Sequence, residues 1–202
     1  MAPRADVSDE RKSQILDAAV KVIAKRGFAE ARMDDIVEEA GISKGLVYWY
    51  FKSKDAVLEA LVRRLFQPEM GTIRELPRQP GTARDRLLRF ADQSARQVAA
   101  IMRLVPITFE FYTMAFRNKP IRKVINEFFA TYFENIKEVI DQGITAGEFR
   151  KTDPAQAAVT IGAVLEGALL LWMFDLRPVD LATQIRSGVE TVVRGLESGG
   201  GS

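Results

Sequence analysis

The sequence contains neither cysteine nor histidine. Without cysteine no disulfide framework can form, which fits a reducing compartment. Zinc sites built from imidazole and thiolate are excluded, and so are catalytic triads that use histidine as the base. The sequence therefore predicts no metal site, no cofactor and no enzymatic activity, although an enzyme that uses carboxylates or lysine would still be chemically possible.

The chain also has little excess of positive over negative charge. The chain has 29 Lys and Arg against 27 Asp and Glu, a formal net charge of +2, so total charge does not indicate a nucleic-acid partner. Residues 41–54 do contain Lys44, Lys52 and Lys54 without any acid. On charge alone, a solvated surface is the better interpretation of such a small cluster.

Long apolar runs that could span a membrane are absent too. The longest, residues 159–174, contains Glu166 and is too short and too charged for a spanning helix, so we expect a buried helix there. Residues 1–14 are polar and charged and lack the apolar core of a secretory signal. We therefore expect a cytoplasmic protein with no membrane partner.

Apolar residues recur at helical spacing along nearly the whole chain, which predicts an all-α fold of about nine helices. We expect a three-helix helix-turn-helix domain over residues 1–52 and a larger helical ligand-binding and dimerisation domain over residues 53–196. Residues 197–202 should form a flexible tail. Residues 67–81 contain three prolines and two glycines, which favour a linker or irregular loop.

Two short helices are predicted close to the N-terminus, at Met33–Ala40 and Lys44–Phe51. The turn between them contains Gly41, and Ser43 is suited to cap the second helix. Two helices joined in this way can place the second in the DNA major groove. The spacing alone is a weak signal, because any three-helix bundle can contain such a corner.

The residues themselves make the signal specific. Residues 33–54 have the sequence MDDIVEEAGISKGLVYWYFKSK, which resembles the N-terminal domain of TetR-type transcriptional regulators. The similarity covers about Ser8–Leu65, including the helix stop at Gly27. In the C-terminal part, Gly143, Gly147–Phe149, Asp153–Pro154 and Glu166–Gly167 resemble the family more loosely.

This resemblance implies a homodimer in which each N-terminal domain binds half of an inverted-repeat DNA operator. It implies DNA contacts by Arg32, Met33, Asp34, Ser43, Lys44, Gly45, Tyr48, Trp49, Tyr50 and Lys54. Lys44 and Gly45 would contact base edges, whereas Tyr48, Tyr50 and Lys54 would contact phosphates. Trp49 is equally suited to packing against the first helix, and Tyr50 to partial burial.

Arg32 is a departure from the family, which usually has threonine at this N-cap position. Loss of a capping side chain costs on the order of 1 kcal/mol. An arginine at the same place could instead reach a DNA phosphate. Both interpretations are open at this point.

Residues 82–196 are rich in aromatic side chains. Such side chains at helical spacing are more often core than ligand cage, but the family resemblance implies an effector cavity among the middle helices. An apolar cavity would suit a lipophilic effector such as an acyl chain, an aromatic compound or a drug. The candidate ligand-binding residues are Met102, Phe109, Glu110, Tyr112, Phe116, Phe128, Phe129, Tyr132, Phe133, Leu169, Trp172 and Met173.

Glu110 and Glu166 each lie in a largely apolar segment. A buried carboxylate needs a partner or a raised pKa. Either one could receive a cationic ligand, Arg103 or another chain could equally satisfy it, and Glu166 also suits a dimer interface.

Small residues in the last two predicted helices would let helices approach closely across a two-fold axis. The candidate dimer-interface residues are Ala158, Gly162, Leu165, Glu166, Gly188, Val189 and Val192. The sequence thus favours a homodimeric repressor that a lipophilic effector releases from DNA. The alternatives are a helical ligand-binding dimer that does not bind DNA and an all-α enzyme that uses Glu110 or Glu166.

Overall fold

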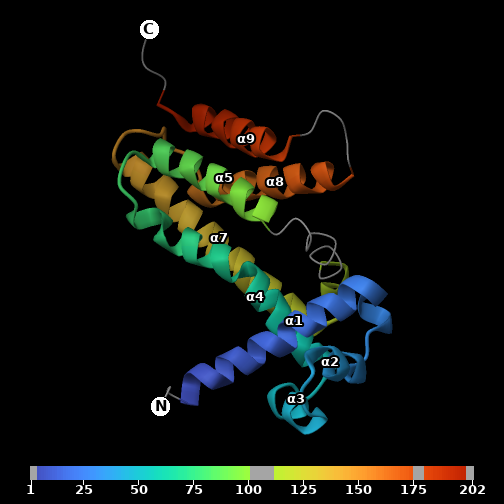
Figure 1. The fold of residues 1–202 in the computed structure, drawn as a ribbon. Helices are drawn as coiled ribbons and strands as arrows, with labels where there is room; N and C mark the ends of the chain where they lie inside the picture. Colours follow the sequence, from blue (N-terminus) through green and yellow to red (C-terminus); the bar gives the residue numbers. More distant parts are fainter. Residues whose placement is uncertain (1–3, 101–111, 175–179, 199–202) are drawn as a thin grey trace. The chain divides into compact units, whose positions relative to one another are not determined.

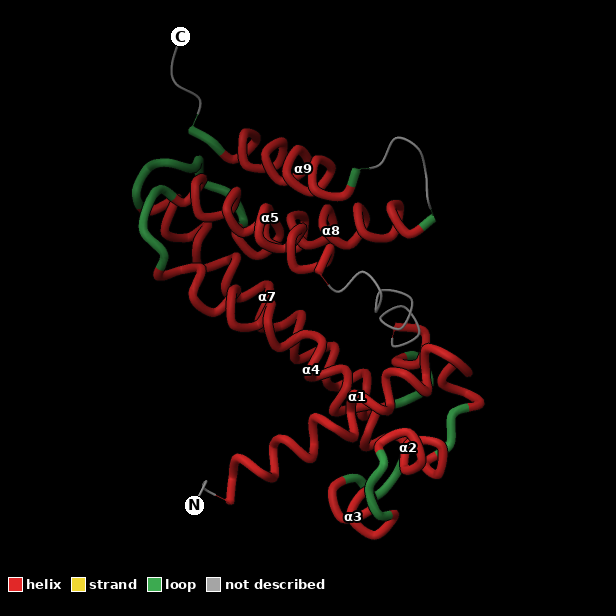
Figure 2. The backbone as a smooth tube through the Cα atoms, in the orientation of Figure 1, coloured by secondary structure: helices red, strands yellow, loops and turns green. Residues whose placement is uncertain are grey.

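A computed structural model describes residues 4–100, 112–174 and 180–198. The described part of the chain is helical, and Figure 2 shows helices joined by short loops. An isolated bridge between Phe149 and Glu197 is the strand-type pairing within it. Contacts divide the chain into an N-terminal unit, Met1–Leu65 with Pro106–Ile125, and a C-terminal unit, Phe66–Val105 with Asn126–Ser202. The fold is all-α, as predicted.

The N-terminal unit begins with helices α1 (Arg4–Glu30), α2 (Met33–Ala40) and α3 (Lys44–Tyr50), which lie together in Figure 1. Gly27 interrupts α1 with a φ of 75°, a conformation that glycine adopts without steric cost, so the predicted helix stop is confirmed. The apolar faces of the three helices supply the core of this unit, which includes Ile15, Ala19, Ile36 and Val47.

The corner between α2 and α3 follows from its local sequence. Gly41 ends α2 in the left-handed region, with a φ of 65°. The Ser43 hydroxyl accepts a hydrogen bond of 3.3 Å from the Leu46 backbone N–H and so caps α3. The predicted helices, turn and cap are confirmed.

Helix α4 (Lys54–Glu75) is longer than the sequence suggested. It continues through Pro68 and is followed by a 3₁₀ turn, η1 (Leu76–Arg78), so the loop expected over residues 67–81 is wrong for most of its length. Pro68 cannot donate the backbone hydrogen bond to residue 64. Burial of Ile73 on the continuing helix and of Leu76 in η1 outweighs that loss.

A capping box precedes helix α5 (Ala83–Ala100) in the C-terminal unit. The Asp85 backbone N–H donates to the Thr82 hydroxyl at 3.0 Å, and the Thr82 N–H donates to the Asp85 carboxylate at 3.4 Å. Arg86 is buried one turn later and donates to the Pro77 carbonyl at 2.8 Å and to the Gln142 side chain. This arginine therefore ties η1 and α7 to α5.

Three further helices complete the described C-terminal unit: α7 (Lys119–Thr145), whose first turns belong to the N-terminal unit, α8 (Pro154–Met173) and α9 (Leu181–Leu196). Asp153 and Asp180 cap α8 and α9 through their carboxylates. Helix α8 is long and apolar enough to cross a membrane by length and composition, with 39% of that window buried. Its contacts with α7 and α9 are those of a partly buried core helix.

Candidate nucleic-acid interface and ligand-binding region

Helix α3 presents one buried and one open face. Val47 is fully buried, whereas Lys44, Gly45 and Trp49 are exposed. Trp49 is 65% exposed and meets the Tyr50 ring edge to face, with 4.7 Å between the ring centres. An apolar ring held in solvent beside a lysine is an arrangement suited to a partner outside the chain.

Lys44 is oriented by a neighbour on α2. Its ammonium lies 2.7 Å from the Asp34 carboxylate and 5.8 Å from the centre of the Tyr48 ring. The hydrogen bond with Asp34, and then the charge of Asp34, raise the pKa of Lys44. Both side chains are more than half exposed, so water and salt weaken their attraction and leave the lysine available to a phosphate or a base edge.

Lys54 has a structural role that the sequence did not reveal. Its ammonium donates to the Phe28 carbonyl at 2.9 Å and to the Ala29 carbonyl at 3.2 Å, and lies 4.4 Å from the centre of the Phe28 ring. An ammonium has three donors, so one is left for a phosphate. A DNA contact by Lys54 stays a prediction.

Arg32 provides no side-chain cap for α2, because a guanidinium has no acceptor. Asp35 supplies the reciprocal half of the cap by accepting the Arg32 backbone N–H at 2.9 Å, and it also pairs with Arg26 at 2.9 Å. The Arg32 side chain is exposed, and its contact with a phosphate stays a prediction, as does that of the half-buried Met33.

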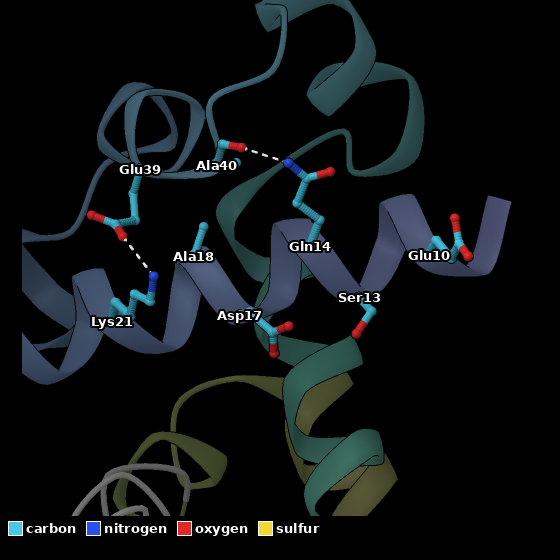
Figure 3. Close-up of a pocket in the computed structure, with 8 residues that line it drawn as sticks. All are labelled: Glu10, Ser13, Gln14, Asp17, Ala18, Lys21, Glu39 and Ala40. Carbon is cyan, nitrogen blue, oxygen red and sulfur yellow. Dashed lines mark hydrogen bonds and ion pairs between the residues drawn. The ribbon is translucent and has the colours of Figure 1, made fainter. Parts of the chain in front are cut away.

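A groove between α1 and α2 lies on another part of the N-terminal unit (Figure 3). It is crossed by the Lys21–Glu39 ion pair of 3.1 Å and by a hydrogen bond of 2.8 Å from Gln14 to the Ala40 carbonyl. Glu10 and Asp17 add further negative charge to its lining. With three carboxylates and one lysine, this groove is unsuited to phosphate.

In the C-terminal unit, four of the candidate ligand residues meet in an aromatic cluster. Phe128 stacks on Phe66 with 4.2 Å between ring centres, and Tyr132 meets Phe90 at 5.4 Å. We define the aromatic cluster as Phe66, Phe90, Phe128, Phe129, Tyr132 and Phe133. The sequence interpretation missed Phe66 and Phe90, although both lie on apolar helical faces.

The other candidate ligand residues are placed differently. Tyr112 and Phe116 fall in the N-terminal unit, and Phe116 is 80% exposed. Leu169, Trp172 and Met173 are half-buried near the end of α8. Met102, Phe109 and Glu110 lie outside the described residues.

Several candidate dimer residues are already used within one chain. A Cβ on Gly162 would lie 2.6 Å from the Phe133 ring, and one on Gly188 would lie 2.5 Å from Val164, so both glycines permit close helix packing inside the C-terminal unit. Ala158, Leu165 and Val189 are buried there, whereas Glu166 and Val192 are half-buried. The exposed residues of α8 include the apolar Val159, Ala163, Leu170 and Leu171, which the sequence interpretation did not select.

Glu69 is a carboxylate with a shifted pKa that the sequence interpretation did not single out. Burial and the nearby charge of Glu166 raise the pKa of the Glu69 carboxyl to about 7, while the Ser94 hydroxyl favours its charged form. These three side chains come from α4, α8 and α5 respectively. Glu69 lies in the Pro- and Gly-rich segment that was expected to be a loop. The sequence therefore gave no indication that it lies on a packed helix.

The α3 surface and the helical C-terminal unit together define a helix-turn-helix DNA-binding regulator with a ligand-binding domain. Two family models match the chain: bacterial regulatory proteins of the tetR family over residues 15–61, and the C-terminal domain of BetI-type transcriptional repressors over residues 83–196. The chain belongs to the TetR family of transcriptional regulators and is not an enzyme.

Relatives extend over nearly the full chain. The fatty acid metabolism regulator protein of Bacillus subtilis (strain 168) is 26% identical, over 92% of this chain and 95% of its own. The structure of SmeT, the repressor of the Stenotrophomonas maltophilia multidrug efflux pump SmeDEF, is 25% identical, with a TM-score of 0.79 and coverage of 94% and 91%. FadR from Bacillus subtilis in complex with stearoyl-CoA is 26% identical, with a TM-score of 0.77 and coverage of 92% and 99%.

Proposed function

We propose that this chain is a homodimeric, cytoplasmic repressor that binds an inverted-repeat operator and is released from it by a lipophilic small molecule. The observation that carries the proposal is the open face of α3, where Lys44, Gly45 and Trp49 are exposed beside Tyr48. The similar protein SmeT is described as a repressor. The FadR structure is a complex with stearoyl-CoA, which has a long apolar acyl chain.

Gly45 supports a DNA-facing role for α3. A Cβ at this position would meet nothing within 4 Å, so packing inside the chain does not require glycine. Glycine inside a helix costs about 1 kcal/mol relative to alanine. Close approach of a partner's backbone to α3 would explain why this position has no side chain.

Dimerisation is supported by the apolar residues that one chain leaves exposed on α8. Val159, Ala163 and Leu170 recur at helical spacing, so they line one face of that helix. A second copy related by a two-fold axis would cover this face and pair the two DNA-binding units. Such pairing suits half-sites about 34–36 Å apart, or a multiple of that distance.

The effector would act through a coupling energy between two sites. Binding of the ligand in the C-terminal unit favours a separation of the DNA-binding units that no longer matches the half-sites. A coupling energy of about 1–3 kcal/mol weakens DNA binding roughly 5- to 150-fold. That range is enough for a regulatory switch.

DNA binding is tested by fluorescence anisotropy with the DNA upstream of the protein's own gene. We expect Lys44→Ala to weaken binding at least about tenfold and to reduce the slope of log affinity against log salt by about 1 if the lysine contacts a phosphate. Tyr48→Phe should weaken it about threefold, the loss of one hydrogen bond. Lys52→Ala, at an exposed position outside α3, is the matched control. Unchanged affinity in both test variants would show that α3 is not the DNA surface.

Gly45→Ala separates a DNA-facing role from a folding role. The added methyl group should raise the thermal midpoint slightly, because alanine is the better helix former, yet weaken DNA binding severalfold. Gly71→Ala in α4, where a Cβ would also meet nothing within 4 Å, is the control and should raise stability without affecting DNA binding. Equal DNA affinity in the two variants would contradict close approach at Gly45.

The dimer and the effector are tested separately. Light scattering should give a dimer mass for the wild type and a monomer for Leu170→Glu, while Ala24→Glu, on the exposed side of α1, stays dimeric. Native mass spectrometry of the purified protein should identify a lipophilic compound that dissociates the DNA complex. A DNA complex insensitive to every extracted compound would contradict release by an effector.

A further inference from the structure

Lys44 and Asp34 form a pair of opposite charges on the open face of the N-terminal unit. Lys44 is the first residue of α3, and Asp34 is the second residue of α2. The Lys44 ammonium lies 2.7 Å from a carboxylate oxygen of Asp34, and the two side chains are 62% and 69% exposed. A partner that approaches the first turn of α3 therefore meets a cation and an anion side by side.

Folding of the unit gains little from Asp34. Asp35, the next residue, accepts the Arg32 backbone N–H at the start of α2 and pairs with Arg26. The pair between Asp34 and Lys44 is exposed, so water and salt screen its attraction. Stability is therefore a weak reason for an acid that partly neutralises a lysine on the candidate DNA surface.

The charge pair is poorly suited to a phosphate. A phosphate offers negative charge and acceptor oxygens, which an ammonium attracts and a carboxylate repels. With Asp34 2.7 Å from the Lys44 ammonium, attraction of a phosphate by the lysine would be offset by repulsion from the acid. A better partner offers an acceptor to Lys44 and a donor to Asp34, a short distance apart.

The major-groove edge of a G·C base pair has this arrangement. Guanine O6 accepts from the cytosine N4 amino group, so an acceptor and a donor lie one hydrogen-bond length, about 2.9 Å, apart. Both atoms can form a further hydrogen bond in the groove. Their spacing matches the 2.7 Å between the Lys44 ammonium and the Asp34 carboxylate. Because the ammonium only donates and the carboxylate only accepts, the match has a single orientation.

An A·T pair also presents a donor beside an acceptor, but the neighbouring groups differ. The adenine N6 donor is next to the N7 acceptor, which would repel the carboxylate, and thymine O4 is next to a methyl group, which offers the ammonium nothing. In a G·C pair, guanine N7 is a second acceptor for the ammonium, which has three donors. These neighbours favour G·C over A·T.

We propose that Lys44 and Asp34 together recognise one G·C base pair in each operator half-site, with Lys44 donating to guanine O6 and N7 and Asp34 accepting from cytosine N4. Gly45, where a Cβ would meet nothing within 4 Å, leaves room for the start of α3 to approach the base edges. This inference rests on the proposed function, because it names the base pair that the same α3 surface recognises.

The test begins with selection from a pool of DNA duplexes that contain about 30 random base pairs, enough for two half-sites. The full-length protein should select an inverted repeat in which one G·C pair recurs in each half-site. Replacing that pair by A·T in one half-site should weaken binding about 5- to 150-fold, the range of a good base contact. Selected half-sites that share no G·C pair would overturn the proposal.

Substitutions assign the preference to the charge pair. Asp34→Asn should raise affinity for both duplexes, because a negative charge is removed, but much more for the A·T duplex, because an amide can donate as well as accept. The G·C to A·T affinity ratio should fall at least about fivefold. Glu39→Gln removes the same charge from the same helix, where Glu39 pairs with Lys21 at 3.1 Å, and should preserve the ratio. An unchanged ratio in Asp34→Asn, or an equal fall in Glu39→Gln, overturns the proposal.

N4-methylcytosine at the selected position separates a direct contact of Asp34 from an effect on the orientation of Lys44. The methyl group replaces the N4 hydrogen that points into the groove and leaves the other to pair with guanine. The wild type should bind this duplex severalfold more weakly than the unmodified one, whereas Asp34→Ala should bind both equally. Equal binding of the two duplexes by the wild type would overturn the contact with cytosine.

Failure of this inference and failure of the proposed function give different results. If Lys44→Ala and Tyr48→Phe leave DNA affinity unchanged, α3 is not the DNA surface and both fail. If these variants weaken DNA binding while Asp34→Asn retains the preference for G·C, α3 is still the DNA surface and only the recognition of a G·C pair by Asp34 and Lys44 fails.

Discussion

The two units of this chain differ in how deeply they bury polar side chains. In the N-terminal unit the Lys44–Asp34 pair is more than half exposed on both sides. In the C-terminal unit Arg86 and Ser94 are buried, and Glu69 is partly covered beside a second carboxylate.

The difference teaches what each unit is built to meet. Exposed charges contribute little to folding and can exchange a protein partner for a phosphate at low cost. Buried polar groups weaken folding unless they are satisfied. Mutations that remove polar groups should therefore have large effects on stability in the C-terminal unit and small ones in the N-terminal unit.

The largest effect is expected for Glu69→Gln. The pKa of Glu69 is raised from 4.5 to about 7 in the folded protein, so the native state retains a proton that the unfolded state loses between those values. The contribution of Glu69 therefore turns unfavourable as the pH rises from about 4.5 to 7. The variant should be more stable than the wild type by on the order of 3 kcal/mol at pH 8 and nearly equal to it at pH 4.5.

Urea unfolding of both proteins across this pH range measures the difference, and the subtraction cancels most other titrating groups. Burial raises the pKa of Glu69 most, followed by the charge of Glu166 from α8, while the Ser94 hydroxyl from α5 lowers it; Glu166 and Ser94 are both retained in the variant. If the difference in unfolding free energy between Glu69→Gln and the wild type did not change with pH, the contrast drawn between the two units would be wrong.

Gly143→Ala should come next. Its Cβ would lie 2.5 Å from the Phe149 ring and 2.8 Å from the Ala83 Cβ, so α7, α5 and the segment that holds Phe149 would have to shift. Overpacking costs roughly 1–3 kcal/mol and is offset in part by the better helix propensity of alanine. Thermal unfolding should show a net loss of about 1–2 kcal/mol. With Gly71→Ala as the control, a gain in both variants would show that the C-terminal core is loosely packed.

Lys54→Met should have a smaller effect, confined to the N-terminal unit. It removes the hydrogen bonds to the Phe28 and Ala29 carbonyls at the end of α1 while keeping the apolar stem. We expect a loss of about 1 kcal/mol in urea unfolding. Hydrogen exchange should be faster at the end of α1 than in the exposed-site control Lys52→Met. A loss as large as the effect of Glu69→Gln would contradict the contrast between the units.

Asp34→Asn should have the smallest effect on stability, less than about 0.5 kcal/mol, because its pair with Lys44 is exposed. DNA affinity measured by anisotropy should rise severalfold, since a carboxylate near the phosphates is removed. A fall in DNA affinity would instead show that Asp34 holds Lys44 in the orientation that DNA requires.

Local sequence was enough to predict the α2–α3 corner, because Gly41, Ser43 and the apolar residues between them act over a few positions. The caps at Thr82 and Asp153 were predictable for the same reason. The loop expected over residues 67–81 was wrong because burial of Ile73 and Leu76, a tertiary effect, outweighs the local cost of Pro68 and Gly71.

The influence of Glu166 and Ser94 on Glu69 could not be predicted, because these residues come from three helices spread over about half of the chain. Glu166 was singled out by its apolar surroundings in sequence, whereas Glu69 lies among polar neighbours and gave no such signal. The aromatic cluster was half predicted, through the α7 residues whose helical spacing is regular. The DNA contacts and the dimer face are still predictions, since both need a partner molecule.

Pro68 makes α4 easier to bend at one position than along the rest of its length. The helix passes from the N-terminal unit to the C-terminal unit after Leu65, and the missing bond between residues 64 and 68 spans this boundary. Arg64, at the same place, is held to α1 by an ion pair of 2.8 Å with Asp17. Helix α4 therefore consists of two regular helical segments that meet at Pro68. Bending the helix at this residue breaks fewer hydrogen bonds than bending it elsewhere.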